Sequence, residues 1–232
     1  MATTPAIDAW TNAVKYIKNY GGTQTLDSLD LRAMNAANRQ FHLAAPWSWS
    51  VGALEEVTLA NGTQDYALVS GPTDYLRLSQ VRQFVNGKFT GTMAVAGNLP
   101  ATTVSVSAPT QVSMFDNGGT YTYRVWPKPA GMLLGKEITL IGDYKKTTTA
   151  ITSGNKSTAD ILLFPDEYYY IYELLVLHYA MLYANDNRAG TVSIDVRGRS
   201  EASGIIGHAM NEINILRQQE PLSRTPEGGP VA

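Results

Sequence analysis

The chain lacks cysteine entirely, and only three of its 232 residues are histidines. Without thiols it cannot form a disulfide bond, a thiolate nucleophile or a cysteine-ligated zinc site. None of His42, His178 and His208 has a second histidine at the helical spacing of a metal site, and His208 with Glu212 is an isolated pair. No metal ion and no cofactor are therefore expected.

Complete nucleotide-binding and nucleophile motifs are also missing. Gly154–Thr158 resembles the end of a phosphate-binding loop, but Asn155 occupies the position that requires glycine. No Gly-x-Gly-x-x-Gly motif follows an expected strand, and Ser200 lacks the second glycine of a nucleophile elbow. These absences predict that the chain is not an enzyme.

Charge is scarce as well. Only 16% of the residues are charged, against about a quarter in an average protein, and the net charge is −2. Nothing in this balance provides the basic field that holds nucleic acid. The most apolar run, residues 168–184, is short for a membrane span and contains Glu173 and His178. Residues 1–9 lack the basic and apolar pattern of a secretory signal, so no membrane segment is expected.

The hydrophobic pattern predicts helices at both ends of the chain. Pro5 suits the first turn of one helix and Pro165 the first turn of another. The helix after Pro165 is apolar almost all round, so it must be buried or pressed against a neighbour. The helices are expected at about residues 5–20, 28–45, 165–184 and 194–219.

The middle of the chain has the alternation of strands. The dipeptide Asn61-Gly62 lies between two short apolar runs and predicts a hairpin, because both residues tolerate positive φ. Further strands are expected near residues 76–82, 121–125 and 138–141. Residues 86–119, rich in Gly, Ala, Ser and Thr, are expected to form an extended β arm.

This order of helices, strands and helices predicts an α+β fold, in which a helical bundle formed by the N- and C-terminal helices carries an inserted antiparallel β domain. The bundle would comprise residues 1–45 and 165–220, and the β domain residues 46–164 with the arm at 86–119. Residues 221–232 have no core-forming pattern and are expected to be an extended tail.

Aromatic residues are the most distinctive feature. Trp47 and Trp49 would share one face of a strand, either as a hydrophobic lid or as a sugar platform. The tyrosines of the third helix are either core residues or contacts between subunits, since tyrosine buries a large ring and keeps a polar group. The subunit-contact candidates are Tyr168, Tyr169, Tyr172, Leu175, Tyr179 and Tyr183.

Five segments together resemble a known family. They are Pro46-Trp47-Ser48-Trp49, residues 59–68, residues 74–78, residues 123–129, and Phe164-Pro165-Asp166-Glu167 opening a long helix that ends at Arg188-Ala189-Gly190. The pattern resembles the head-to-tail adaptor proteins of tailed bacteriophages, the group that includes the tail tubular protein A type. The resemblance covers most of the chain, and residues 86–119 have no counterpart in it.

The resemblance implies a structural virion protein assembled in the host cytoplasm into a dodecameric ring in the virion neck. The ring would join the portal protein to a tail tube or nozzle protein and surround a channel through which DNA passes without specific binding. The helical part would face the portal and the β part the tail. The C-terminal tail would dock, with Leu222, Arg224 and Val231 as portal-docking candidates.

Two other classes remain open. The chain could be a carbohydrate-binding or adhesive β module of a phage fibre or surface protein, with Trp47, Trp49 and Trp126 as platforms. It could also be an enzyme with an unrecognised carboxylate site, built for example on Asp166-Glu167 or Glu55-Glu56, which predicts a cleft with perturbed acids.

Overall fold

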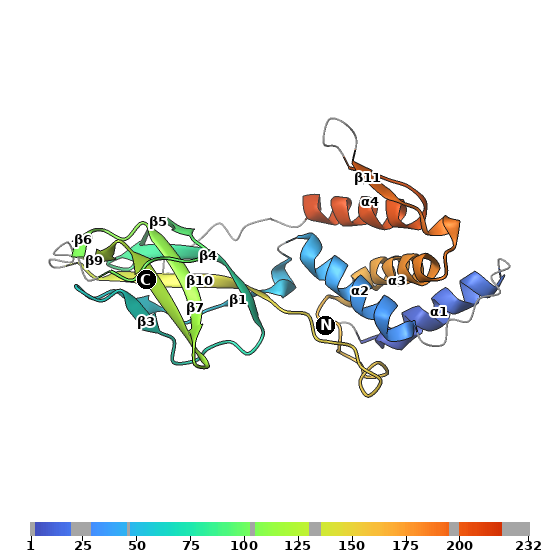
Figure 1. Cartoon of the computed structure of the whole chain (residues 1–232), viewed down its shortest axis with the longest axis horizontal. Helices are drawn as coiled ribbons and strands as arrows, with labels where there is room; N and C mark the ends of the chain where they lie inside the picture. The colour runs from blue at the N-terminus through green and yellow to red at the C-terminus, as the bar shows by residue number, and fades with distance from the viewer. Residues whose placement is uncertain are drawn as a thin grey trace. The chain divides into compact units, whose positions relative to one another are not determined.

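The computed structural model describes residues 3–19, 29–45, 47–102, 105–129, 136–194 and 200–219 (Figure 1). The helices are α1 (Ala6–Asn19), α2 (Asp30–Ala44), α3 (Tyr169–Tyr183) and α4 (Gly204–Gln219), with single 3₁₀ turns η1 (Ser48–Ser50), η2 (Asp166–Tyr168) and η3 (Asn187–Ala189). The strands are β1 (Val51–Ala53), β2 (Val57–Thr58), β3 (Asp65–Ala67), β4 (Tyr75–Val85), β5 (Lys88–Val95), β6 (Ser105–Ser107), β7 (Gln111–Asn117), β8 (Thr120–Trp126), β9 (Lys128–Pro129), β10 (Ile138–Lys146), β11 (Val192–Ile194) and β12 (Ser200–Ala202).

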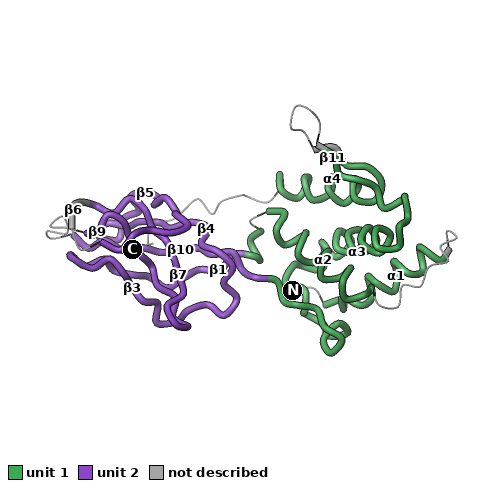
Figure 2. Tube along the Cα trace, in the orientation of Figure 1, with its two compact units in different colours: residues 1–50, 148–223 green, residues 51–147, 224–232 purple. Residues whose placement is uncertain are grey.

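The described residues divide into two compact units (Figure 2). The helical unit contains those up to Ser50 and those from Thr148 onward, and the β unit contains those from Val51 to Thr147. The content of helices and strands confirms the predicted α+β class. Residues 148–164, which the sequence pattern grouped with the strands, belong to the helical unit, because apolar side chains such as Leu162 are buried in its core.

The centre of the helical unit is α3, which contacts α1, α2 and α4. Its side chains Tyr172 and Leu175 are fully buried, as are Met34 and Phe41 of α2. A helix that is apolar on nearly every side is stable in water only when other elements cover most of its surface. The sequence of α3 therefore explains its central position.

Polar contacts fasten the beginning of α1 to the beginning of α3. The carboxylate of Asp166 accepts hydrogen bonds from the Thr3 backbone N–H (2.7 Å) and hydroxyl (2.6 Å). The Tyr169 hydroxyl donates to the carbonyl oxygen of Pro5 (2.8 Å) and accepts from the Ala9 N–H (3.0 Å). At the start of α1, these bonds pair the Ala9 N–H and give the Pro5 carbonyl oxygen a second donor besides the Asp8 N–H.

The buried imidazole of His178 makes the stability of the helical unit depend on pH. Its Nδ1 lies 2.7 Å from the carbonyl oxygen of Ala189, and burial lowers the pKa of His178 below its ordinary value. The folded state therefore favours the neutral imidazole of His178. Its contribution to the free energy of unfolding is fully present above pH ~6.5 and is lost as the pH falls through the folded-state pKa. Urea unfolding between pH 7.5 and 5 should show this loss, and His178→Gln should flatten the profile. His208→Gln, at an exposed position of α4, is the control that should leave it unchanged.

The last helix is shorter than the sequence pattern predicts. It begins at Gly204, whereas Val192–Ile194 and Ser200–Ala202 form the antiparallel ladder β11–β12. Glycine makes this arrangement possible: Gly190 has φ 79°, and a Cβ there would lie 1.8 Å from the carbonyl oxygen of Ser203. The close approach of these two backbone segments prevents the helix from extending toward its predicted start at 194.

The β unit contains a curled sheet of eight strands, in the order β1-β10-β4-β5-β7-β8-β3, with β2 pairing to β10 beside β1, and a separate two-stranded sheet of β6 and β9. Its core contains the fully buried residues Val81, Val112, Tyr123, Val125 and Leu140. The prediction of an antiparallel domain is wrong at two pairings, because β5 pairs with β7 in parallel and β6 pairs with β9 in parallel. A parallel neighbour requires a crossover of about a dozen residues or more, and residues 96–110 provide it.

The stretch predicted as an extended arm, residues 86–119, contributes β5 and β7 to the interior of the sheet order. Asn86 and Gly87 have φ 49° and 73°, as a two-residue turn between β4 and β5 requires. A hairpin is therefore formed at this Asn-Gly pair, inside the predicted arm.

The Asn61-Gly62 pair does not form the predicted hairpin. Gly62 does have positive φ (75°), but β2 before the turn pairs with β10, and β3 after it pairs with β8. The flanking strands have only two and three residues, so a ladder between them would be short. Instead, β2 pairs with the longer strand β10 and β3 pairs with the longer strand β8, so every residue of each short strand has a partner in the sheet.

Candidate functional site

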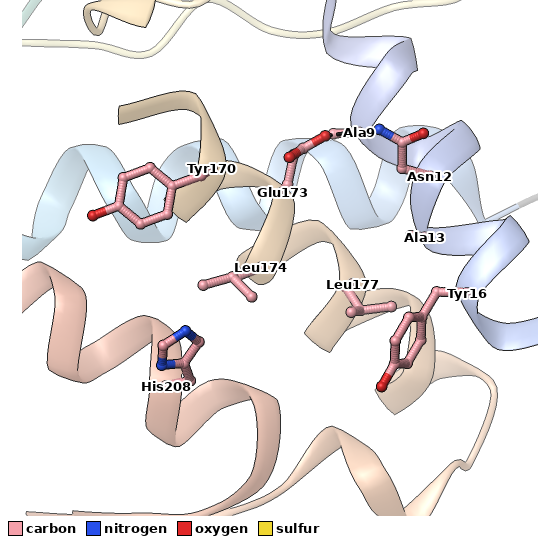
Figure 3. Close-up of a pocket in the computed structure, with 9 residues that line it drawn as sticks. All are labelled: Ala9, Asn12, Ala13, Tyr16, Tyr170, Glu173, Leu174, Leu177 and His208. Atoms are coloured by element: carbon pink, nitrogen blue, oxygen red, sulfur yellow. Dashed lines mark hydrogen bonds between the residues drawn. The ribbon is translucent and has the colours of Figure 1, made fainter. Parts of the chain in front are cut away.

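One side of α3 is left uncovered by the other helices. Successive residues of an α-helix are about 100° apart, so Tyr170, Leu174 and Leu177 share one side, and Tyr172, whose hydroxyl is 3.4 Å from the Met34 carbonyl of α2, lies opposite. An apolar groove of about 400 Å³ opens on this uncovered side. In Figure 3, α1 and α4 border the groove and α3 forms its floor.

The floor is mainly apolar, and the borders contain both polar and small apolar residues. Leu174 and Leu177 lie between His208 of α4 and Tyr16 of α1 (Figure 3). On the α1 border, Ala9 and Ala13 have small side chains that leave the space open, and these complete the apolar lining. Such a lining of leucine, alanine and tyrosine is suited to bury apolar side chains of another polypeptide.

Two carboxylates are associated with the groove: Glu173 is part of its lining, and Glu212 is hydrogen-bonded to the lining residue Tyr170. Glu173 accepts a hydrogen bond from the Asn12 side-chain amide at 2.8 Å, which ties α3 to α1. Glu212 accepts one from the Tyr170 hydroxyl at 2.8 Å, which ties α4 to α3. Burial, together with the hydrogen bond to Glu212, raises the pKa of Tyr170 to about 12, so the phenol stays protonated at physiological pH. The groove thus combines an apolar floor with these negative charges.

The structure separates the six predicted subunit-contact residues into two groups. Tyr169, Tyr172 and Leu175 are buried inside this chain, so they are part of its own core and are not exposed to a second copy. The other three side chains are half-buried at the surface of the helical unit: Tyr168, Tyr179 and Tyr183. The contact itself stays a prediction, and only this second group can contribute to it directly.

The tryptophans do not form a common platform. Trp47 is 1% exposed and donates its indole N–H to the Phe41 carbonyl oxygen at 2.7 Å. Trp49 stacks on it with ring centroids 5.0 Å apart. Trp126 belongs to the other unit. The hydrophobic-lid interpretation of Trp47 is therefore the one the geometry favours over a sugar platform.

One carboxylate of each predicted pair has structural partners. Both oxygens of Glu55 accept bonds from backbone N–H groups, those of Val69 and Ser70, and so hold the loop before β4. The hydrogen bond from the Thr3 hydroxyl lowers the pKa of Asp166, the direction opposite to that of a catalytic acid. Among the described residues, no group of three His, Asp or Glu side chains is placed to hold a metal ion.

The portal-docking candidates Leu222, Arg224 and Val231 lie outside the described residues. Of the helices in the described ranges, none is long and apolar enough to cross a membrane.

The groove itself was missed by reasoning from the sequence. The apolar pattern of the third helix predicted that all its sides would be covered, but it did not show which side the neighbouring helices leave open. A three-residue stripe at 170, 174 and 177, with Glu173 among the apolar positions, is the only indication that the sequence contained.

The comparison with protein families identifies the chain's relationship. The model of the family described as SU10 adaptor protein matches residues 6–226, nearly the whole chain. No curated protein matches the chain.

Proposed function

The chain belongs to the SU10 adaptor protein family of bacteriophage head-to-tail adaptors, and from this premise we propose that it forms a ring in the virion neck, between portal and tail. The observation that carries the proposal is the family match over residues 6–226. The protein is a structural component of the virion in this proposal and not an enzyme. Within the family, the proposed subtype is the tail tubular protein A type.

The two units have separate roles in the proposed ring. The four helices act together as a bundle that faces the portal protein, and the β unit faces a tail tube or nozzle protein. The chain has two units, and each has its own apolar core. This supports the proposal of separate roles, because each unit can present its own surface to a different partner.

Copies of the chain meet head to tail, twelve to a ring in this proposal. A contact between two different surfaces of the same protein produces a closed ring when its rotation closes. DNA passes through the ring without specific binding, and the net charge of −2 is compatible with a conduit that does not hold phosphates strongly. Assembly takes place in the host cytoplasm.

Native mass measurement with negative-stain imaging tests the ring. The chain is examined at high concentration, alone and with the portal protein of the same phage. A closed ring, in either sample, is the expected result. A monomer in both samples contradicts the proposal.

Removal of the C-terminal tail tests whether residues 222–232 dock to the portal protein. Deleting residues 222–232 is expected to leave thermal unfolding unchanged and to weaken binding to the portal protein, because those residues contain no core-forming pattern. Affinity for the portal is measured by biolayer interferometry. A chain of full length in which Leu222, Arg224 and Val231 are replaced by serine is the matched variant, and it should lose the same affinity. Unchanged portal affinity in both variants would remove the tail from the docking surface.

A further inference from the structure

We propose that the groove on α3 receives the outward face of α2 from a second copy of this chain. This inference rests on the proposed ring and names the two surfaces that meet in it. It is carried by the shape and charge of two surfaces on opposite sides of α3, neither of which the sequence pattern identified.

The outward face of α2 is a stripe of four residues. Arg32, Ala36, Arg39 and Leu43 are spaced by four, three and four residues, which places them along one side of the helix. Arg32, Arg39 and Leu43 are exposed. Within the described part of the chain, neither guanidinium forms an ion pair with a carboxylate. The stripe therefore offers two positive charges and one apolar side chain around a small central residue.

The groove has the complementary features. Its floor residues Tyr170, Leu174 and Leu177 have i, i+4, i+7 spacing, which places them in a row along one side of α3. Ala36 at the centre of the stripe lets the incoming helix approach this floor closely. Glu173 in the groove lining, and Glu212 next to the lining residue Tyr170, provide the negative charges that the arginines of the incoming helix would meet.

The geometry makes the contact head to tail. In each copy α2 packs on the side of α3 that contains Tyr172, and the groove opens on the opposite side. A copy that inserts its α2 into a neighbour thus keeps its own groove open for the next copy. Such a contact repeats around a ring, whereas a contact between identical surfaces would end at a dimer.

The stripe borders one of the predicted subunit-contact residues. The guanidinium carbon of Arg32 lies 4.3 Å from the centre of the Tyr183 ring, and the ring of Tyr179 is next to that of Tyr183 at 5.9 Å. Both tyrosines are half-buried. They are therefore placed to join the edge of the same contact.

Charge reversal on each surface tests the inference. One variant carries Arg32→Glu with Arg39→Glu, and the other carries Glu173→Lys with Glu212→Lys. Each alone places like charges across the contact and should weaken self-association roughly 100-fold. Mixed in equal amounts, they should assemble into rings of alternating copies, because each contact in the mixture then joins opposite charges. Arg217→Glu, a reversal on an exposed part of α4 that faces away from Glu212, is the control and should assemble like the unmodified chain.

Native mass measurement of the unmodified chain, each variant and the mixture decides the outcome, under the conditions in which the unmodified chain forms its ring. Thermal unfolding verifies that each variant is folded, and Glu212→Lys alone replaces the groove variant if the double substitution unfolds. Variants that assemble alone, or a mixture that fails to assemble, would overturn the inference about these two surfaces. The proposed ring itself would not be contradicted by either result. An unmodified chain that forms no ring would overturn the proposed function and this inference together.

Discussion

Leu175→Asp is expected to unfold the helical unit at neutral pH. Leu175 is 0% exposed at the centre of α3, the helix that contacts the three others. A carboxylate at this position would be buried without a partner, which costs more than about 4 kcal/mol, a large part of the stability of a typical domain. Loss of the cooperative transition in thermal circular dichroism is the measurement.

Leu182→Asp is the matched control for this result. It introduces the same charge on the same helix, but Leu182 is 46% exposed, so the aspartate would remain in water. Its unfolding midpoint should change little. If Leu175→Asp instead gave a folded monomer that no longer assembled, Leu175 would belong to a contact between copies and its place in the core would be wrong.

Gly142→Ala is expected to destabilise the β unit by about 2–3 kcal/mol. The added Cβ would lie 1.9 Å from the hydroxyl oxygen of Tyr123, which is far inside van der Waals contact. The ring of Tyr123 is fully buried in the core of the sheet and cannot swing away without moving its neighbours. Urea unfolding, followed by tryptophan fluorescence, measures the change.

A second substitution tests the stated cause. Tyr123→Phe removes the oxygen that the new methyl group would meet, so the double variant should recover most of the stability lost in Gly142→Ala. Recovery is expected to be partial, because the Cβ would still lie 3.1 Å from Leu54. Additive losses in the double variant would show that the hydroxyl is not the obstacle.

Local patterns predicted the helices well where they had a clear start and a continuous apolar side. The first helix begins at Ala6, directly after Pro5, and the second at Asp30. The first position follows from proline geometry and both follow from the spacing of apolar residues, which depend on only a few neighbouring residues. The predicted start of the last helix was wrong, because the close approach of Gly190 to Ser203 determines where that helix begins. This contact joins two separate segments of the chain, and no local pattern indicates it.

Strand positions were easier to predict than strand partners. Alternation in the sequence indicated strands that the structure places at β4, β8 and β10. It could not show that β5 and β7 pair in parallel, or that the flanks of Asn61-Gly62 pair with different strands. Pairing depends on which long strands have an open edge in the curled sheet, and no local pattern encodes that.

By itself, the sequence determined the α+β class, most of the helices, and the absence of the thiols on which disulfide and cysteine chemistry depend. It also identified the third helix as one that other elements must cover. Only the tertiary structure decided how that helix is used: Tyr172 and Leu175 are buried in the chain's own core, while the side with Leu174 and Leu177 opens as a groove. The physical reason is that an all-round apolar helix has no preferred side of its own. Its open side is set by the packing of α1, α2 and α4, contacts between residues far apart in the sequence.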